Sequence, residues 1–302
     1  MTGTAVTADE LRPLMLSIAY RMVGSATEAE DLVQEAFLRL HQTDEEVGHP
    51  RAWLTTVLTR LCIDHLRSAR VRREQYVGTW LPEPLLADPA PDVAAQAELA
   101  DTLSLAFLVV LETLSPVERA VFLLHDVFGY DYAEVAPMVE RSEANCRQLA
   151  VRARRRVEDG TPRFDPSREQ REELASRFFA ALEDGDTDAL ADVLAADAAF
   201  YGDGGGKAPA APRPLHGREK VVRFLGNFAR IGRRQGASLR LAEVNGQPGA
   251  LALDAEGALI SVLALDVVDG AIAAVRGVPN PDKLAYISRT ILPSLPPDLK
   301  RS

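Results

Sequence analysis

The chain has 302 residues, and at roughly 100 to 200 residues per domain this length corresponds to two or three domains. Its 47% hydrophobic content can fill several small cores and excludes a disordered or fibrous protein. With 44 acidic and 34 basic residues the net charge is −10, which on average argues against a nucleic-acid or membrane binder.

Two short windows depart from this acidic average. Residues 60–73 carry five arginines against Asp64 alone, and residues 141–156 carry six arginines against Glu143. Because affinity for phosphate depends on the local density of basic groups, both windows are candidate nucleic-acid contacts. Cys62 and Cys146 do not belong to a cluster of several Cys and His residues, and no leader or membrane span is recognisable, so we expect a cytoplasmic chain without metal or cofactor.

The first part of the chain, up to about residue 73, has a helical pattern. Residues 27–30 read as a capping box, and the helix that follows places its apolar residues on one stripe. Pro50 suits the first turn of a further helix, whose apolar stripe runs from Trp53 to Cys62. A compact helical bundle accounts for both stripes.

A proline-rich linker follows this bundle. Residues 80–92 include four prolines and no basic residue, which is typical of an extended, acidic segment and excludes a helix. Ser115, Pro116 and Glu118 then combine an N-cap, a first-turn proline and a third-position glutamate, so a new helix begins there and ends near Gly129.

Two shorter helices should come next. Asp131 can cap the first, through about residue 139, and Ser142 the second, which is basic on its outer face. Two helices joined by a short turn, with the second one basic, predict a helix-turn-helix.

The last part of the chain changes character. We expect helices over residues 167–183 and 187–195, a short strand near residues 198–201 and a helix after Gly217. Four strand-like runs follow at 238–245, 249–254, 258–268 and 271–278, and Asp269-Gly270 is a type I′ hairpin signal. Helices followed by an antiparallel sheet predict an α+β domain.

Several of these segments resemble a known family. Residues 29–40 (AEDLVQEAFLRL), 50–54 (PRAWL) and 64–67 (DHLR) resemble region 2 of bacterial sigma factors of the extracytoplasmic-function (ECF) group. Residues 114–122 (LSPVERAVF) and 147–154 (RQLAVRAR) resemble region 4 of the same group. This long, ordered match covers roughly residues 8–158. It implies a non-enzymatic protein that binds core RNA polymerase and directs initiation at promoter DNA.

The resemblance also implies roles for single residues. A polar face around one leucine would dock on the polymerase: Asp31, Gln34, Glu35 and Leu38. Arginines at and beyond the end of a long helix would contact the −10 element as the strands part: Arg60, Arg67, Arg70, Arg72 and Arg73. Arg60 stands where many relatives have Asn, which favours a phosphate or stacking role over amide readout of a flipped base.

The recognition helix of region 4 would read the −35 element in the major groove. Its candidate contacts are Arg141, Ser142, Glu143, Asn145, Arg147, Gln148, Arg152 and Arg155. Two residues depart from the usual pattern. Glu140 occupies a turn position where relatives often have Gly, at a cost of about 1 kcal/mol if it is left-handed. Pro137 falls inside the first helix and predicts that this helix is shortened or bent.

The C-terminal part resembles the SnoaL-like, NTF2-fold tail of one ECF subgroup. Three motifs carry this resemblance: WLPEP at residues 80–84, DGGGK at 203–207 and NPDKL at 280–284. The predicted fold is therefore multidomain, with two all-α sigma domains followed by an α+β NTF2-like cone. The predicted boundaries are 7–75 for region 2, 76–100 for the linker, 101–160 for region 4 and 167–292 for the tail.

Because the linker and tail motifs occur together in that subgroup, we expect the tail to regulate the sigma regions in cis, without a separate anti-sigma factor. The expected contact residues are Trp80, Leu81, Pro82, Glu83, Pro84, Asp203, Gly204, Gly205, Gly206, Lys207, Asn280, Pro281, Asp282 and Lys283. The three glycines after Asp203 indicate a turn that approaches another surface closely.

Two alternatives remain open from the sequence. The tail could be an isomerase- or cyclase-type enzyme, or a sensor of an unknown small molecule, using acid and base groups among Tyr201, Asp203, His216, Asp254, Asp266 and Asp282. In the weaker alternative, suggested by Arg60 and Pro137, the protein is a scaffold whose sigma-like half no longer melts DNA.

Overall fold

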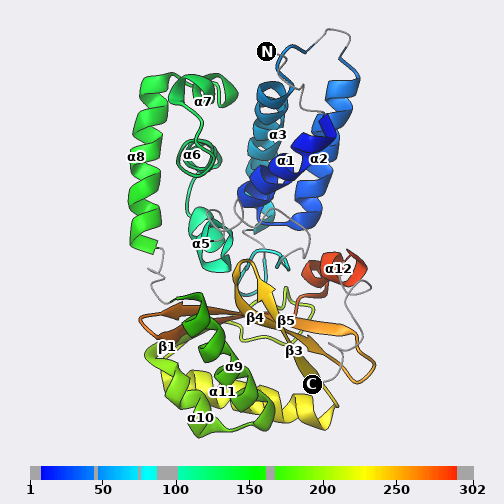
Figure 1. Cartoon of the computed structure of the whole chain (residues 1–302), viewed down its shortest axis with the longest axis vertical. Coiled ribbons are helices and arrows are strands. Elements are labelled where there is room, and N and C mark those ends of the chain that lie inside the picture. Colours follow the sequence, from blue (N-terminus) through cyan, green and yellow to red (C-terminus); the bar gives the residue numbers. More distant parts are fainter. Residues whose placement is uncertain (1–7, 44–46, 74–75, 87–100, 161–166, 291–302) are drawn as a thin grey trace. The chain divides into compact units, whose positions relative to one another are not determined.

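The computed structural model describes residues 8–43, 47–73, 76–86, 101–160 and 167–290 (Figure 1). Contacts between residues divide the chain into two units: residues 1–75 with 108–161, and residues 76–107 with 162–302. The linker therefore groups with the tail, together with residues 101–107 of the predicted region 4, and the rest of the two predicted sigma domains shares one unit. No helix in the described ranges is long and apolar enough to cross a membrane.

The first unit begins with three helices, α1 (Ala8–Val23), α2 (Ala26–His41) and α3 (Pro50–Arg73). Their apolar stripes pack together, and Val33 of α2 and Leu54 and Leu58 of α3 are fully buried. The cap of α2 differs from the expected one. The Ser25 side chain accepts a hydrogen bond from Glu28 N, so the helix begins before Thr27 and the capping box expected at residues 27–30 is wrong.

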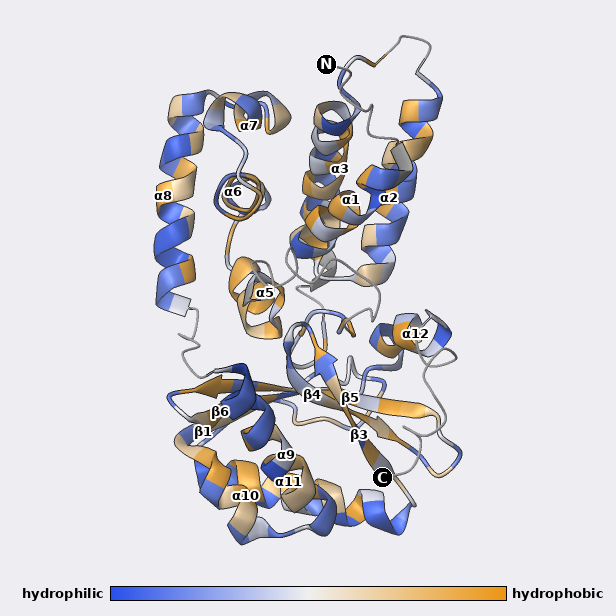
Figure 2. Ribbon diagram, in the orientation of Figure 1, coloured by the Kyte–Doolittle hydropathy of each residue, from blue (hydrophilic) through white to orange (hydrophobic). Residues whose placement is uncertain are grey.

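The second group of helices in this unit is α6 (Pro116–Phe122), a π-helical turn (Leu123–Val127), α7 (Tyr132–Met138) and α8 (Glu143–Gly160). The start of α6 is confirmed: Ser115 and Glu118 form a reciprocal capping box with Pro116 in the first turn. The helix α5 (Leu105–Leu111), which precedes this group, is hydrophobic along its whole length, whereas α8 has large hydrophilic stretches (Figure 2).

The helix-turn-helix formed by α7 and α8 is confirmed. Pro137 lies in the last turn of α7, and Val139 N still donates to Val135 O at 3.1 Å. The helix is short, as expected, but it is continuous through the proline because the missing donor falls close to its end. Glu140 in the turn has φ = 54°, the left-handed conformation that was anticipated there.

The tail contains a six-stranded sheet of order β2-β1-β6-β5-β4-β3. Strand β1 pairs with β6 in parallel, and all other neighbours are antiparallel. The strands are β1 (Leu194–Gly202), β2 (Leu215–His216), β3 (Ser238–Val244), β4 (Gln247–Leu253), β5 (Leu259–Val268) and β6 (Ala271–Val278). The four later strands and the hairpin at Asp269-Gly270 agree with the prediction, whereas β2 was missed.

Helices cover the sheet on both faces. On one face α9 (Arg168–Asp184), α10 (Thr187–Val193) and α11 (Arg218–Arg234) pack on a core that includes Phe178 and Phe200 (Figure 1). On the other face α12 (Pro281–Thr290), which was not predicted, buries Leu284 and Ile287 against β4 and β5. The α+β class expected for the tail is confirmed.

Candidate functional site

The expected polymerase-docking residues lie on one side of α2. Asp31 and Gln34 are exposed, and Leu38 is one of the exposed large hydrophobic residues, with 47% of its surface accessible. Glu35 is held in an ion pair with Arg39 one helical turn further on, at 2.8 Å. This face therefore offers polar groups around one unburied leucine, while the opposite side of α2 buries Val33 and Ala36.

The expected −10 residues all lie within α3, which runs to Arg73, so none of them lies beyond the end of the helix as was expected. Arg67 is exposed and forms an ion pair with Asp64 at 3.0 Å. The side chains of Arg70, Arg72 and Arg73 lie outside the described residues. His65 bonds to Glu28 of α2 at 3.0 Å, which gives this histidine a packing role within the bundle.

The Arg60 side chain is engaged by the helix-turn-helix. Its Nη2 donates to the carbonyl of Pro137 at 2.9 Å, its Nε donates to the carbonyl of Met138 at 3.4 Å, and Nη1 lies 3.5 Å from the Glu140 carboxylate. The two carbonyls belong to the last turn of α7, where backbone acceptors have no partner within the helix. In this arrangement the guanidinium is bound by protein groups.

A buried arginine that the sequence reasoning did not assign joins the same two helical groups. Arg119 of α6 donates to the carbonyl of Met22 near the end of α1 at 2.6 Å, and it lies 2.7 Å from Glu112. Burial lowers the pKa of Arg119 to about 9. The signal that could have singled out Arg119 is its place in the region 4 motif, directly after Glu118. A buried arginine in that motif needs partners within the fold.

The expected −35 residues gather at the start of α8. Arg141, Ser142, Glu143, Arg147 and Gln148 are exposed, and Asn145 is half-buried. The Ser142 hydroxyl accepts from Asn145 N at 3.3 Å and caps the helix. Glu143 pairs with Arg147 at 2.8 Å along the helix surface. The N-terminal turns of α8 therefore present donors and acceptors to solvent, as a groove-reading helix requires.

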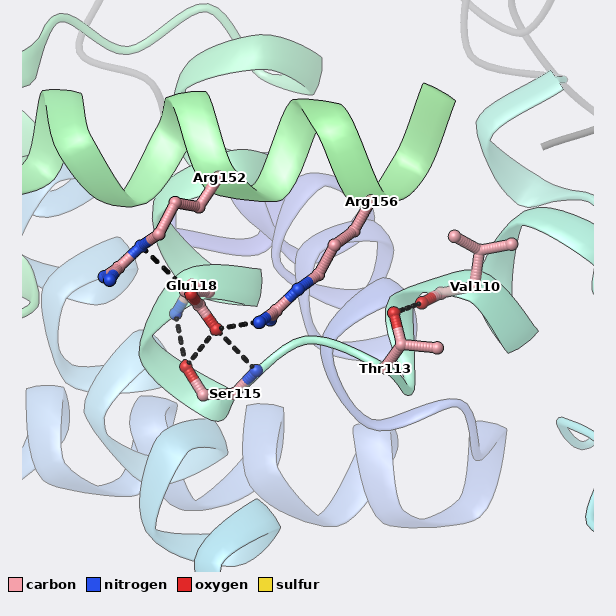
Figure 3. Close-up of polar contacts among 6 residues, drawn as sticks. All are labelled: Val110, Thr113, Ser115, Glu118, Arg152 and Arg156. Atoms are coloured by element: carbon pink, nitrogen blue, oxygen red, sulfur yellow. Dashed lines mark hydrogen bonds and ion pairs between the residues drawn. The ribbon is translucent and has the colours of Figure 1, made fainter. Parts of the chain in front are cut away.

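Further along α8, arginines turn back onto α6 through Glu118 (Figure 3). Arg152 lies 3.5 Å and Arg156 3.1 Å from the Glu118 carboxylate, which also accepts from the backbone N and the hydroxyl of Ser115. Burial raises the pKa of Glu118, but the Ser115 hydrogen bonds and the two arginine charges outweigh it, so this pKa is lowered overall. Arg152 is thus paired within the domain although its side chain is exposed, and Arg155 is exposed as well.

The linker motif and the tail motifs meet at Asp203. This carboxylate is fully buried and accepts hydrogen bonds from Leu81 N at 2.8 Å, from the Tyr76 hydroxyl at 2.5 Å and from Lys283 Nζ at 2.6 Å. Tyr76 was not among the expected residues, because it lies four positions before the WLPEP motif. Burial and then the hydrogen bond to Asp203 raise the pKa of Tyr76 above its usual range.

Lys283 connects the last motif to the linker. Its ammonium bonds to the carbonyl of Leu81 and lies over the rings of Trp80 at 4.4 Å and Tyr76 at 5.1 Å. These contacts combine a buried ion pair with two cation–π interactions. Pro82, Glu83 and Pro84 continue this buried stretch of the linker.

The glycine loop, residues 203–207, needs its glycines because its backbone closely approaches neighbouring groups. A Cβ at Gly204 would lie 2.2 Å from the carbonyl oxygen of Ala208, and one at Gly205 would lie 2.3 Å from the Asn280 amide. Gly206, with φ = 71°, approaches Val77 of the linker. Lys207 forms an exposed ion pair with Asp282 at 2.5 Å. The structure therefore contains the turn that the sequence indicated, one that closely approaches a neighbouring surface.

Among the remaining candidate acid and base groups, Asp266, Tyr201 and His216 are neighbours, because Arg276 of the Asp266 ion pair lies over the Tyr201 ring at 4.7 Å. Asp266 is paired with Arg276 at 2.8 Å, and Asp254 accepts from backbone amides in a turn between β4 and β5. Tyr201 and His216 lie edge to face, with ring centroids 6.2 Å apart. Because neighbouring strand residues point to opposite faces, Tyr201 points away from the core that contains Phe200.

Comparison with known proteins agrees with this architecture. Residues 7–72 match the family Sigma-70 region 2, and residues 104–157 match Sigma-70, region 4. The chain is 43% identical over 289 residues to the ECF RNA polymerase sigma factor SigJ of Mycobacterium tuberculosis, covering 91% of each chain. It is 34% identical to the probable ECF sigma factor SigI of that species, covering 90% of this chain and 92% of the relative. The crystal structure of SigJ superposes with a TM-score of 0.74 at 39% identity, covering 92% of this chain and 98% of that one.

Proposed function

The chain belongs to the ECF RNA polymerase sigma factors, and we propose that its tail regulates it in cis by holding the linker between its two promoter-recognition regions. As a sigma factor it binds core RNA polymerase and directs transcription initiation at promoter DNA. We also place the protein in the cytoplasm, where the polymerase works.

Polymerase binding is assigned to the exposed face of α2. Leu38 is the apolar centre of this face, and Asp31 and Gln34 flank it. A Leu38→Ala variant should weaken binding to core polymerase about tenfold without loss of stability, since this side chain is largely unburied. Ile231→Ala, which removes a side chain of similar exposure from α11, is the control. Equal binding by both variants would contradict the assignment.

Promoter contacts are assigned to α3 and to the start of α8. Arg60 and Arg67 follow the −10 strand through its phosphates, together with Arg70, Arg72 and Arg73. The exposed side chains of Arg141, Arg147 and Gln148 face the −35 bases. Because Arg60 is bonded to the end of α7, its contact with DNA requires that this bond is exchanged for a phosphate.

Regulation in cis rests on one observation: the buried Asp203 carboxylate holds Leu81 N, while Lys283 holds Leu81 O. Both backbone groups of one linker residue are thus occupied by the tail. A linker held in this way cannot change its path freely, so the tail restricts how the two promoter-recognition regions can be spaced. The tail then does the work of a separate anti-sigma factor.

An enzymatic tail is the rival proposal, and the geometry favours regulation over it. Asp203, Asp266 and Asp282 are each in an ion pair, and Asp254 caps a turn. Acid and base catalysis needs titratable groups that converge on one substrate. The four aspartates are instead held in structural contacts, and the Tyr201 ring contacts Arg276 and His216.

The test of cis regulation is Asp203→Asn in the full chain, with Asp192→Asn on the exposed side of α10 as the control. Hydrogen exchange at Leu81 should become faster, and run-off transcription with core polymerase should change. If exchange at Leu81 accelerates while transcription stays the same, the contact is structural only and cis regulation is overturned. Unchanged exchange at Leu81 would contradict the role of Asp203 itself.

A further inference from the structure

Asn245, which none of the sequence motifs singled out, makes a second contact between the tail and the linker. It occupies the two-residue turn between β3 and β4 with Gly246, and both residues are left-handed, with φ of 53° and 71°. An Asn-Gly pair is the usual choice for such a type I′ turn, and these tips are normally exposed to solvent. Asn245 is only 1% exposed.

The polar groups of Asn245 bind two residues that are far apart in sequence, Leu85 in the linker and Leu103 just after it. Its Oδ1 accepts from Leu85 N at 2.9 Å, and its backbone N donates to Leu85 O at 2.8 Å. Its Nδ2 donates to Leu103 O at 3.0 Å. One amide side chain therefore holds both ends of the segment from residue 86 to residue 102.

Apolar contacts support this closure on both sides. Leu86 forms an isolated antiparallel bridge with Val244, the last residue of β3. Leu86 and Leu105 both pack on the face of the sheet that α12 covers, in the cluster that contains Val244 and Leu251. Hydrophobic burial thus brings the chain around Leu86 and the chain around Leu105 onto the same part of the sheet, and the directional hydrogen bonds of the Asn245 amide fix how they are oriented there.

We propose that Asn245 is a clasp that sets the reach of the tether between region 2 and region 4. While it is closed, residues 86–102 add nothing to that reach, because both ends are bound to one side chain. When it opens, the contour length of these residues, at most roughly 60 Å, becomes available to the tether. The segment is acidic and has no Lys or Arg, so it does not compete with the promoter-binding arginines for phosphates.

This inference rests on the proposed cis regulation, and it makes Asn245 a positioning residue for promoter spacing. It differs from the Asp203 contact in its consequence. Asp203 and Lys283 fix the path of the linker at Leu81, whereas Asn245 fixes how much chain is available after Leu85. The two contacts can therefore be separated by experiment.

The test is Asn245→Gly in the full chain. A Gly-Gly pair keeps the type I′ turn but removes both side-chain hydrogen bonds. Asp269→Gly is the matched control, because it makes the same change in the exposed turn between β5 and β6. Hydrogen exchange at Leu85 should become about tenfold faster in Asn245→Gly only, while exchange at Leu81 stays slow.

The functional readout is run-off transcription from promoters whose −35 to −10 spacing is varied. Asn245→Gly should broaden the range of spacings used, and deletion of residues 89–99 in the same chain should restore the narrow range. The same deletion in the chain with Asn245 should change nothing, because the clasp already excludes this segment from the tether.

The outcomes separate the two proposals. If Asp203→Asn alters transcription and Asn245→Gly leaves the spacing range unchanged, the clasp is overturned and cis regulation stands. If neither variant has an effect, both are overturned. Should Asn245→Gly melt at lower temperature than Asp269→Gly, Asn245→Asp repeats the promoter-spacing test alone. It keeps the acceptor for Leu85 N, so exchange at Leu85 stays slow, and it replaces the donor to Leu103 O by a repelling oxygen.

Discussion

The ammonium nitrogen of Lys283 lies 2.6 Å from Oδ2 of Asp203, and the two side chains are 13% and 0% exposed. The pair joins α12 to the glycine loop, and both partners also bind the backbone of Leu81. A carboxylate in this position is tolerated because each of its hydrogen-bond donors is present.

Removal of Lys283 should therefore be costly. Lys283→Met leaves the Asp203 charge buried without its counter-ion, and we expect the free energy of unfolding of the tail to fall by about 3–5 kcal/mol. The control is Lys207→Met, which breaks the exposed pair with Asp282 and should cost about 0–1 kcal/mol. Urea unfolding of the two full-length variants measures the difference, and equal losses would contradict the importance of the buried pair.

Glu118 should make region 4 sensitive to acid. Because its pKa is lowered in the folded state, its contribution to stability is present above the ordinary value of 4.5 and is lost as the pH falls through the lowered pKa. Glu118→Gln should destabilise the protein by about 1–3 kcal/mol at pH 7 and by less at low pH. Thermal unfolding followed against pH measures this. Glu143→Gln, which breaks an exposed pair, should cost about 0–1 kcal/mol and is the control.

Glu140 is a site where a substitution should stabilise the fold. A residue other than glycine in the left-handed region carries a penalty, so Glu140→Gly should raise the free energy of unfolding by about 1 kcal/mol. Glu140→Ala removes the same carboxylate, and its weak ion pair with Arg60, while keeping the strain. Equal stability of the Gly and Ala variants in chemical denaturation would show that the turn is not strained.

Arg155 and Arg154 should differ in their effect on DNA binding. Arg155 is exposed, so Arg155→Gln should remove one phosphate contact and make the dependence of log affinity on log salt shallower by about 0.9. Arg154 is held by Asp126 at 2.5 Å, and Arg154→Gln should leave the slope unchanged. The measurement is promoter binding by the polymerase holoenzyme between low and moderate salt. A change of slope in Arg154→Gln alone would reverse the assignment.

Local signals predicted the secondary structure where the chain carries strong caps and turns. Ser115 and Glu118 start α6, and Asp269-Gly270 turns β5 into β6, because these effects act between residues three or fewer positions apart. The cap of α2 was misplaced because Ser25 and Thr27 each precede a glutamate at the same spacing. The two-residue strand β2 has no periodicity to detect, and its pairing with β1 is the only reason that it exists.

The sequence by itself determined the family, the helix-turn-helix and the α+β class of the tail, because motifs, caps and alternation are written in neighbouring residues. Only the tertiary structure decided that Arg60 bonds to the end of α7 and that Asn245 holds Leu85 and Leu103. These hydrogen-bond partners depend on which segments of the chain pack together and exclude water. A buried polar group must find a partner within the fold, and its distance along the chain plays no part in that choice.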